Sequence, residues 1–139
     1  MSTTILVLED DSVLQDLLRE VLQDEGFQVI AATSLPELLE IVPQHARLLI
    51  TDLLFNFETV GLTAIEQVRQ VTQPNLPALI CTAAQKHVEV LQPEIARLGA
   101  YVLTKPFTID ELVATINCAL QPTAPPRTFS LVNALSVGF

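Results

Sequence analysis

The sequence predicts one α/β domain, a five-stranded parallel sheet with helices on both faces. Two observations support this fold class. Five short apolar runs alternate along the chain with five segments of helical apolar spacing. Such alternation is typical of parallel strands joined by right-handed helical crossovers. The length of 139 residues suits one domain, and a hydrophobic content of 50% is enough to build its core.

The first strand, Ile5–Leu8, leads into a helix that Asp11 or Ser12 can cap and that Gly26 ends. Phe27–Ala32 is the second strand. The apolar face of the intervening helix comprises Val13 or Leu14, Leu17, Leu18, Val21 and Leu22.

The second helix begins at a capping box, Ser34 to Glu37, with Pro36 in its first turn. We expect it to run to about His45. The third strand, Leu48–Asp52, follows within the run LLITDLL. Because a strand buried on both faces has no place for a carboxylate, Asp52 should lie at its carboxyl end, where open α/β sheets bind ligands.

The apolar connection Leu53–Val60 ends at Gly61 and precedes a helix over Leu62–Val71. Leu76–Thr82 is the fourth strand.

A helix over Gln85–Leu98 should be kinked or shortened by Pro93 and stopped by Gly99. Tyr101–Leu103 is the fifth strand.

A second capping box, Thr108 to Glu111, opens the last helix, which reaches Leu120. We expect residues 1–120 to form the domain and residues 121–139, with Pro122, Pro125 and Pro126, to form a linker or tail.

Composition limits the function classes. A net charge of -9 argues against a direct nucleic-acid surface, which needs clustered Lys and Arg. Cys81 and Cys118 lie in apolar segments, so we expect two buried free thiols in a reducing compartment. No signal peptide is visible and no run is long enough to span a membrane, so we expect a cytoplasmic protein without membrane contact.

Polar residues follow four of the strands, and parallel strands bring them to one edge of the sheet. They are Glu9, Asp10, Asp11, Asp52, Thr82 and Lys105. Clustered acids repel one another, and Mg2+ with oxygen ligands relieves the repulsion. A hydroxyl and an ammonium suit a phosphoryl group, and an Asp carboxylate can attack phosphorus. The set therefore predicts Mg2+-dependent phosphoryl transfer onto Asp52.

The segments ILVLEDD, LLITD, ICTAA and LTKPF, in this order and spacing, resemble the receiver domains of two-component response regulators. The resemblance covers about Thr4 to Leu120. It implies a doubly wound, flavodoxin-like receiver fold with the strand order 2-1-3-4-5.

The resemblance also implies a role for each matching residue. Asp52 is the phosphoacceptor, Thr82 the switch hydroxyl and Lys105 the phosphate-binding lysine. The ligands of Mg2+ are Asp10 directly, Glu9 through water, Asp52, and the backbone carbonyl of Leu54; Pro106 follows a cis peptide bond.

The sequence departs from the family pattern in three places. The loop after Asp52 lacks the usual Pro and is one residue longer, with Gly61 nine positions beyond the acceptor. The usual position of the switch aromatic carries Val102, and Tyr101 lies one residue earlier, which turns a strand side chain to the other face. Leu54 and Ala84 replace polar groups that often orient the hydrolytic water, which predicts slow dephosphorylation without a partner.

We therefore expect a stand-alone receiver that is phosphorylated by a histidine kinase or histidine phosphotransfer protein. It would act on a downstream protein through the face of its last strand, as a monomer or weak homodimer. It would catalyse its own phosphorylation without being a turnover enzyme.

Two alternatives remain: a degenerate receiver acting as a phosphorylation-independent interaction module, and a Mg2+-dependent aspartyl-phosphate phosphatase. The phosphatase fits loosely, because such enzymes usually carry the nucleophile on the first strand.

Overall fold

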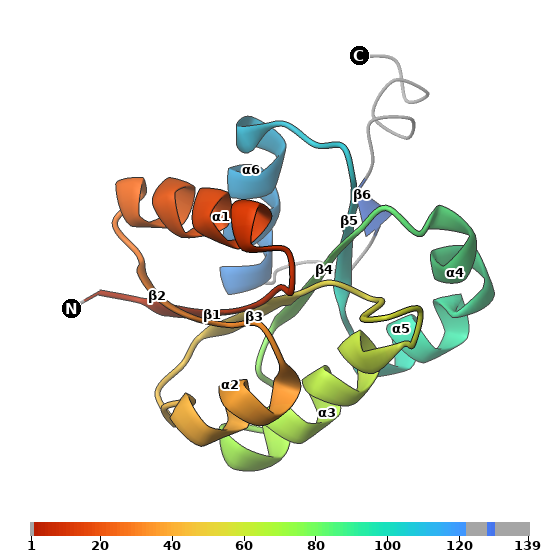
Figure 1. Cartoon of the computed structure of the whole chain (residues 1–139), viewed down its shortest axis with the longest axis horizontal. Coiled ribbons are helices and arrows are strands. Elements are labelled where there is room, and N and C mark those ends of the chain that lie inside the picture. The colour runs from red at the N-terminus through yellow and green to blue at the C-terminus, as the bar shows by residue number, and fades with distance from the viewer. Residues whose placement is uncertain (1, 122–127, 130–139) are drawn as a thin grey trace.

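The computed structural model describes residues 2–121 and 128–129, and its centre is a parallel sheet (Figure 1). The strand order is β2-β1-β3-β4-β5-β6, and every paired strand is parallel. The first five strands confirm the predicted order 2-1-3-4-5 and the flavodoxin-like fold. The strands are β1 (Thr4–Leu8), β2 (Gln28–Ala32), β3 (Leu48–Thr51), β4 (Ala78–Thr82), β5 (Tyr101–Thr104) and β6 (Thr128–Phe129).

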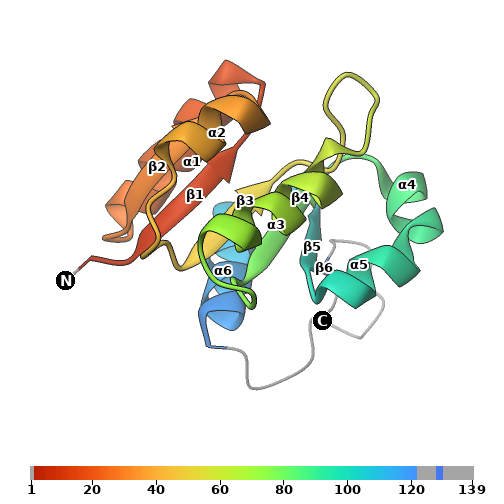
Figure 2. The same cartoon turned by 90° about the horizontal axis from the view of Figure 1, so that it is seen from below.

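Helices cover both faces of the sheet (Figures 1 and 2). Two lie on one face and the others on the opposite face, so the sheet separates two hydrophobic cores. Alternate residues of β1 show the division, since Leu6 and Leu8 enter one core and Ile5 and Val7 the other. The helices are α1 (Ser12–Asp24) and α6 (Ile109–Leu120) on one side, and α2 (Leu35–Ile41), α3 (Val60–Val71), α4 (Gln85–Val90) and α5 (Gln92–Leu98) on the other.

Most of the predicted helix boundaries are confirmed. Asp11 caps α1, and Gly26 follows the helix with a φ of 91°. Ser34 caps α2, and Thr108 and Glu111 form both halves of a capping box at α6. Gly99 ends α5 in the left-handed conformation, at a φ of 64°.

The predicted end of the second helix was wrong, because α2 stops at Ile41 and does not reach His45. Val42 is extended, with ψ at 125°, and Pro43 follows it. Proline disfavours the helical conformation in the residue before it, so the helix ends there.

The predicted helix over Gln85–Leu98 is two helices, α4 and α5, that meet at Leu91. Pro93 lies in the first turn of α5, where its missing N–H has no helical partner to lose. The proline thus shortens the helix as expected.

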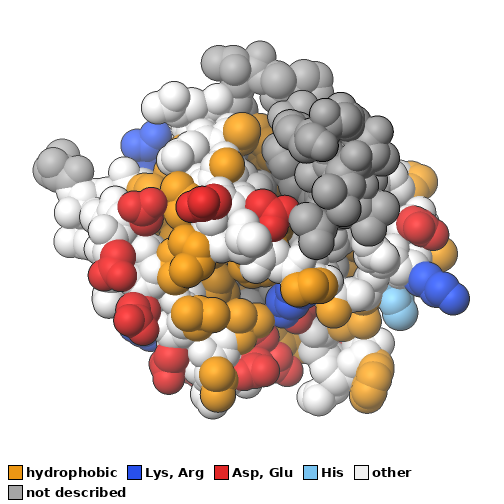
Figure 3. Space-filling view, turned by 90° about the horizontal axis from the view of Figure 1, so that it is seen from above, with side chains coloured by type: hydrophobic (Ala, Val, Ile, Leu, Met, Phe, Trp, Pro, Cys, Tyr) orange, Lys and Arg blue, Asp and Glu red, His pale blue; other side chains and the backbone are white. Residues whose placement is uncertain are grey.

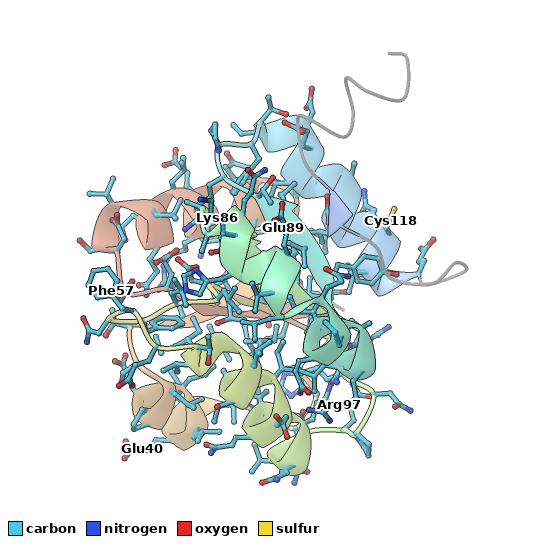
Figure 4. All side chains as sticks on the ribbon, turned by 90° about the vertical axis from the view of Figure 1, so that its right-hand side faces the viewer. Glu40, Phe57, Lys86, Glu89, Arg97 and Cys118 are labelled. Atoms are coloured by element: carbon cyan, nitrogen blue, oxygen red, sulfur yellow. The ribbon has the colours of Figure 1, made fainter. Side chains whose placement is uncertain are left out.

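The predicted buried positions were wrong at two places. Of the two alternatives for the first apolar position of α1, Leu14 packs against the core and Val13 is 77% exposed, and Leu17, also assigned to the apolar face, is 50% exposed. Cys118 is exposed on α6 (Figure 4), whereas Cys81 is buried and burial raises the pKa of its thiol to about 12. On α6, Cys118 lies outside the buried set, which is Leu112, Thr115, Ile116 and Ala119.

A sixth strand was not predicted. β6 pairs with β5 at the edge of the sheet, with Val102 opposite Thr128 and Leu103 opposite Phe129. The rest of the predicted tail beyond Gln121 lies outside the described residues. Within the described residues, no helix is both long and apolar enough to cross a membrane.

Candidate functional site

Three charged residues from the ends of three strands meet at the carboxyl edge of the sheet. Glu9 follows β1, Asp52 follows β3 and Lys105 follows β5. The Lys105 Nζ lies 3.2 Å from Glu9 Oε1 and 3.1 Å from Asp52 Oδ2. One ammonium therefore joins two carboxylates that are far apart in sequence.

Backbone amides fix the carboxylate of Asp52. Its Oδ1 accepts hydrogen bonds from the N–H groups of Leu53, at 2.6 Å, and Leu54, at 3.4 Å. Only 16% of the Asp52 side chain is exposed. The carboxylate is thus oriented, with Oδ2 facing Lys105.

Gly61 lets α3 approach the backbone of Asp52 closely. Its N–H donates to the carbonyl of Leu53 at 3.1 Å. A Cβ at position 61 would overlap the Asp52 carbonyl oxygen and lie 2.9 Å from Leu53 Cα. Only glycine fits there without moving the backbone that carries Asp52.

Glu9 is buried, with 3% of its surface exposed. Burial raises the pKa of its carboxyl, and the charge of Asp52 adds to the rise, while Lys105 and the Asp11 N–H oppose it. The Asp11 N–H donates to Glu9 Oε2 at 3.2 Å. The carboxyl of Glu9 is therefore held between groups that oppose its charge and groups that stabilise it.

Lys105 keeps its charge in this setting. Burial lowers the pKa of its ammonium, but the carboxylates of Asp52 and Glu9 outweigh burial, and the net pKa is raised. The cluster holds two acids and one base, and the excess negative charge lies at the edge of the sheet.

Thr82 and Lys105 are linked through the backbone. The N–H of Lys105 donates to the carbonyl of Thr82 at 2.8 Å, and the buried Thr82 Oγ1 accepts from the N–H of Ala84 at 3.1 Å. The Lys105-Pro106 peptide is cis, as the resemblance implied.

The remaining acids of the edge differ in position. Asp10 is exposed. Asp11 accepts from the N–H groups of Val13 and Leu14 at 2.9 and 3.1 Å, which confirms its expected capping role.

The loop after Asp52 forms a tight hairpin. Phe55 and Glu58 exchange two backbone hydrogen bonds of 2.9 and 3.1 Å. Asn56 and Phe57 between them have φ values of 51° and 64°, as in a type I′ turn. Phe55 packs into the core, whereas Phe57 at the tip is 96% exposed and points away from the molecule (Figure 4).

Tyr101 and Val102 face opposite sides of the sheet. Val102 is in the core beneath α2 to α5, and Tyr101 is in the core beneath α1 and α6. The Tyr101 hydroxyl donates to the carbonyl of Cys118 at 3.4 Å. Tyr101 therefore lies on the side of the sheet away from α4, and the usual aromatic position holds a buried valine.

Sequence reasoning missed one residue that shapes the site. The Gln15 Nε2 donates to the carbonyls of Glu9 and Ala32, both at 3.0 Å, and so ties the loop after β1 to the end of β2. Its helical spacing placed Gln15 on the polar face of α1, and no local pattern distinguished it from its solvated neighbours.

The atoms at this edge that could bind a metal ion are the oxygens of carboxylates and backbone carbonyls. Among residues 2–121 and 128–129, no three His, Cys, Asp or Glu side chains are gathered as a metal cluster. Lys105 instead lies between Glu9 and Asp52.

A parallel sheet in this order, with two acids and a lysine at its carboxyl edge, is the arrangement expected of a receiver domain. The family model described as response regulator receiver domain matches residues 5–117. The chain belongs to this family and is the receiver domain of a two-component response regulator.

Individual proteins similar to this chain include two transcriptional regulatory proteins. The chain is 35% identical over 119 residues to the transcriptional regulatory protein CpxR of Escherichia coli K12, covering 84% of this chain and 49% of CpxR. It is 31% identical over 122 residues to the uncharacterised transcriptional regulatory protein YrkP of Bacillus subtilis, covering 87% of this chain and 51% of YrkP. The chain thus spans about half the length of these relatives.

A solved structure of the chemotaxis response regulator CheY4 of Vibrio cholerae superposes with a TM-score of 0.70 at 27% identity. The match covers 86% of this chain and all of CheY4.

Proposed function

We propose that Asp52 accepts a phosphoryl group from a phosphohistidine of a histidine kinase or histidine phosphotransfer protein, as one step of a phosphorelay. The observation that carries this proposal is the Lys105 ammonium held between Glu9 and Asp52. It supplies a positive charge where the phosphoryl oxygens would arrive.

The chemistry follows from the groups at the site. A carboxylate oxygen of Asp52 attacks phosphorus, the new O–P bond forms, and the P–N bond to the donor imidazole breaks. Lys105 Nζ then binds one phosphoryl oxygen. The hydroxyl of Thr82 donates to another, since its present contact with the Ala84 N–H uses the Oγ1 only as an acceptor and leaves the O–H free to donate.

Mg2+ fits the donor set, which is made of carboxylates and a backbone carbonyl. Asp10 would bind the metal directly, Glu9 through water, and Asp52 and the Leu54 carbonyl would complete the protein ligands. Bound there, the metal would offset the charge that develops on the phosphoryl oxygens.

The phosphoryl group would be read through β5 and its flanking helices, because the Thr82 carbonyl accepts a hydrogen bond from Lys105, the residue that follows β5. A downstream protein would bind one state of this face better and shift the equilibrium between states. We propose a cytoplasmic protein that modifies only itself and is not a turnover enzyme, with no direct nucleic-acid contact by residues 1–120.

Incubation with acetyl phosphate and Mg2+, followed by intact-mass measurement, tests the proposal. We expect one phosphoryl adduct in the parent and in Asp24→Asn, an exposed acid at the far end of α1, and none in Asp52→Asn. An adduct that persists in Asp52→Asn would place the acceptor elsewhere.

The rate at which the adduct decays tests the predicted slow dephosphorylation. Leu54 and Ala84 are partly buried and carry no polar group that could orient a hydrolytic water. We expect the isolated phosphoprotein to be long-lived, and a phosphoryl half-life of seconds would contradict this.

A phosphorylation-independent interaction module is the second candidate function. Val102 in place of the switch aromatic, with Tyr101 on the other face of the sheet, favours it. Absence of any adduct together with failure to bind Mg2+ would support this candidate.

A further inference from the structure

β5 would be an exposed edge strand if the sheet ended at five strands. Its residues, Tyr101 to Thr104, are all buried and include neither charge nor proline. Edge strands of natural proteins usually carry such residues, because unpaired N–H and C=O groups otherwise recruit another strand. β5 has none of these protections of its own.

The chain itself supplies a partner for that edge. Thr128 and Phe129 pair in parallel with Val102 and Leu103, the two central residues of β5. Residues 121–127 link this segment to the end of α6, and the matched family domain ends at residue 117. The added strand thus lies beyond the residues that the family model matches.

We propose that the β5 edge is a strand-binding surface, that Thr128–Phe129 of the same chain occupies it, and that this occupation keeps two copies apart. Two copies would otherwise add to each other through their β5 edges, by the strand addition that exposed sheet edges support. A weak homodimer through the last strand therefore requires β6 to leave first.

The proposal does not rest on phosphorylation, and it can be tested on the unphosphorylated chain of 139 residues. Thr128→Pro/Phe129→Pro removes both backbone donors of β6 and fixes φ near -65°, whereas a parallel strand has a φ of about -120°. Thr128→Val/Phe129→Val is the matched control, since valine keeps both donors and favours strands.

Two measurements decide the outcome. Hydrogen exchange of the peptide covering Tyr101–Thr104 reports whether the edge is covered, with β1 as an internal reference for global folding. Light scattering over a concentration series reports the oligomeric state. We expect the proline variant to exchange faster in β5 but not in β1 and to dimerise, while the parent and the valine variant stay monomeric.

Three results would overturn the proposal. Unchanged exchange in β5 of the proline variant would show that the segment does not cover the edge. Faster exchange without association would show that the cover does not hold copies apart. A dimeric parent would show that a second copy, not the chain itself, provides the strand.

Discussion

At the scale of single residues, the site depends on charges that balance one another at short range. Lys105 serves two carboxylates, and Glu9 is the more buried of the two. Gly61 and Gln15 act on the backbone that carries these acids and not on the acids directly. Each of these features can therefore be tested by substituting a single residue.

The raised pKa of Glu9 leads us to predict how the stability of the protein depends on pH. Burial raises the pKa of Glu9 above its ordinary value of 4.5, so the folded chain takes up this proton at a higher pH than the unfolded chain. This carboxyl therefore makes the folded state less stable as the pH rises from 4.5 through the raised pKa. Glu9→Gln should remove that loss.

Urea unfolding of Glu9→Gln and the parent at a series of pH values checks this. We expect the difference in the free energy of unfolding to grow in favour of the variant with rising pH and then to level off. Glu20→Gln, at an exposed position of α1, is the control. A difference that does not change with pH would contradict the burial argument.

Gly61→Ala should destabilise the protein although alanine favours helices. The gain in helix propensity is about 1 kcal/mol. The overlap with the backbone of Asp52 and Leu53 has no flexible neighbour to relieve it, so overpacking at the upper end of its usual cost gives an expected net loss of about 2 kcal/mol in unfolding free energy. Thr63→Ala, on the exposed face of the same helix, should change stability little. Equal stability of Gly61→Ala and the parent would show that α3 can move away.

At the scale of elements, turns and caps decide where the helices and loops lie. α2 ends before Pro43, α4 and α5 divide near Pro93, and the loop after β3 closes as a two-residue hairpin. The hairpin lies in the loop that is one residue longer than in the family pattern, and it begins shortly after Asp52, the residue that we propose is phosphorylated.

Phe57→Gly should stabilise this hairpin. A non-glycine residue in the left-handed region costs roughly 1–2 kcal/mol, and the Phe57 side chain has almost no packing to lose. Glycine also adds freedom to the unfolded chain, so we expect a net gain of about 0.5–1 kcal/mol in unfolding free energy. Phe57→Ala removes the ring but keeps the strain, and should show no such gain. Equal gains from both substitutions would attribute the effect to the exposed ring.

At the scale of the whole molecule, acidic side chains outnumber basic ones, and Figure 3 shows them spread over one face among exposed hydrophobic groups. The carboxyl edge of the sheet adds further acids at one point. A divalent cation that binds there should therefore stabilise the entire fold.

Thermal and urea unfolding with and without Mg2+ measure this effect. At a concentration a hundred times the dissociation constant, a ligand of the folded state adds about 2.7 kcal/mol to the free energy of unfolding. We expect this stabilisation in the parent and in Asp24→Asn, and its loss in Asp10→Asn and Asp52→Asn. Undiminished stabilisation in Asp10→Asn would remove that residue from the metal ligands.

The sequence by itself determined the order of strands and helices and the position of most caps. These depend on apolar periodicity and on local signals such as Asp11, Gly26 and Thr108, which act within a few residues. It also placed Asp52 and Lys105 at strand ends, which the parallel topology then brought to one edge.

Only the tertiary structure decided the contacts between distant segments. Lys105 bridges Glu9 over 96 positions and Asp52 over 53, and no local pattern encodes which of several acids it reaches. Leu17 and Cys118 are exposed because no neighbouring element packs over them. The pairing of β6 with β5 likewise depends on which segment lies beside β5. Periodicity specifies which face of an element is apolar, but the neighbours that cover a face or an edge are set only when the whole chain has folded.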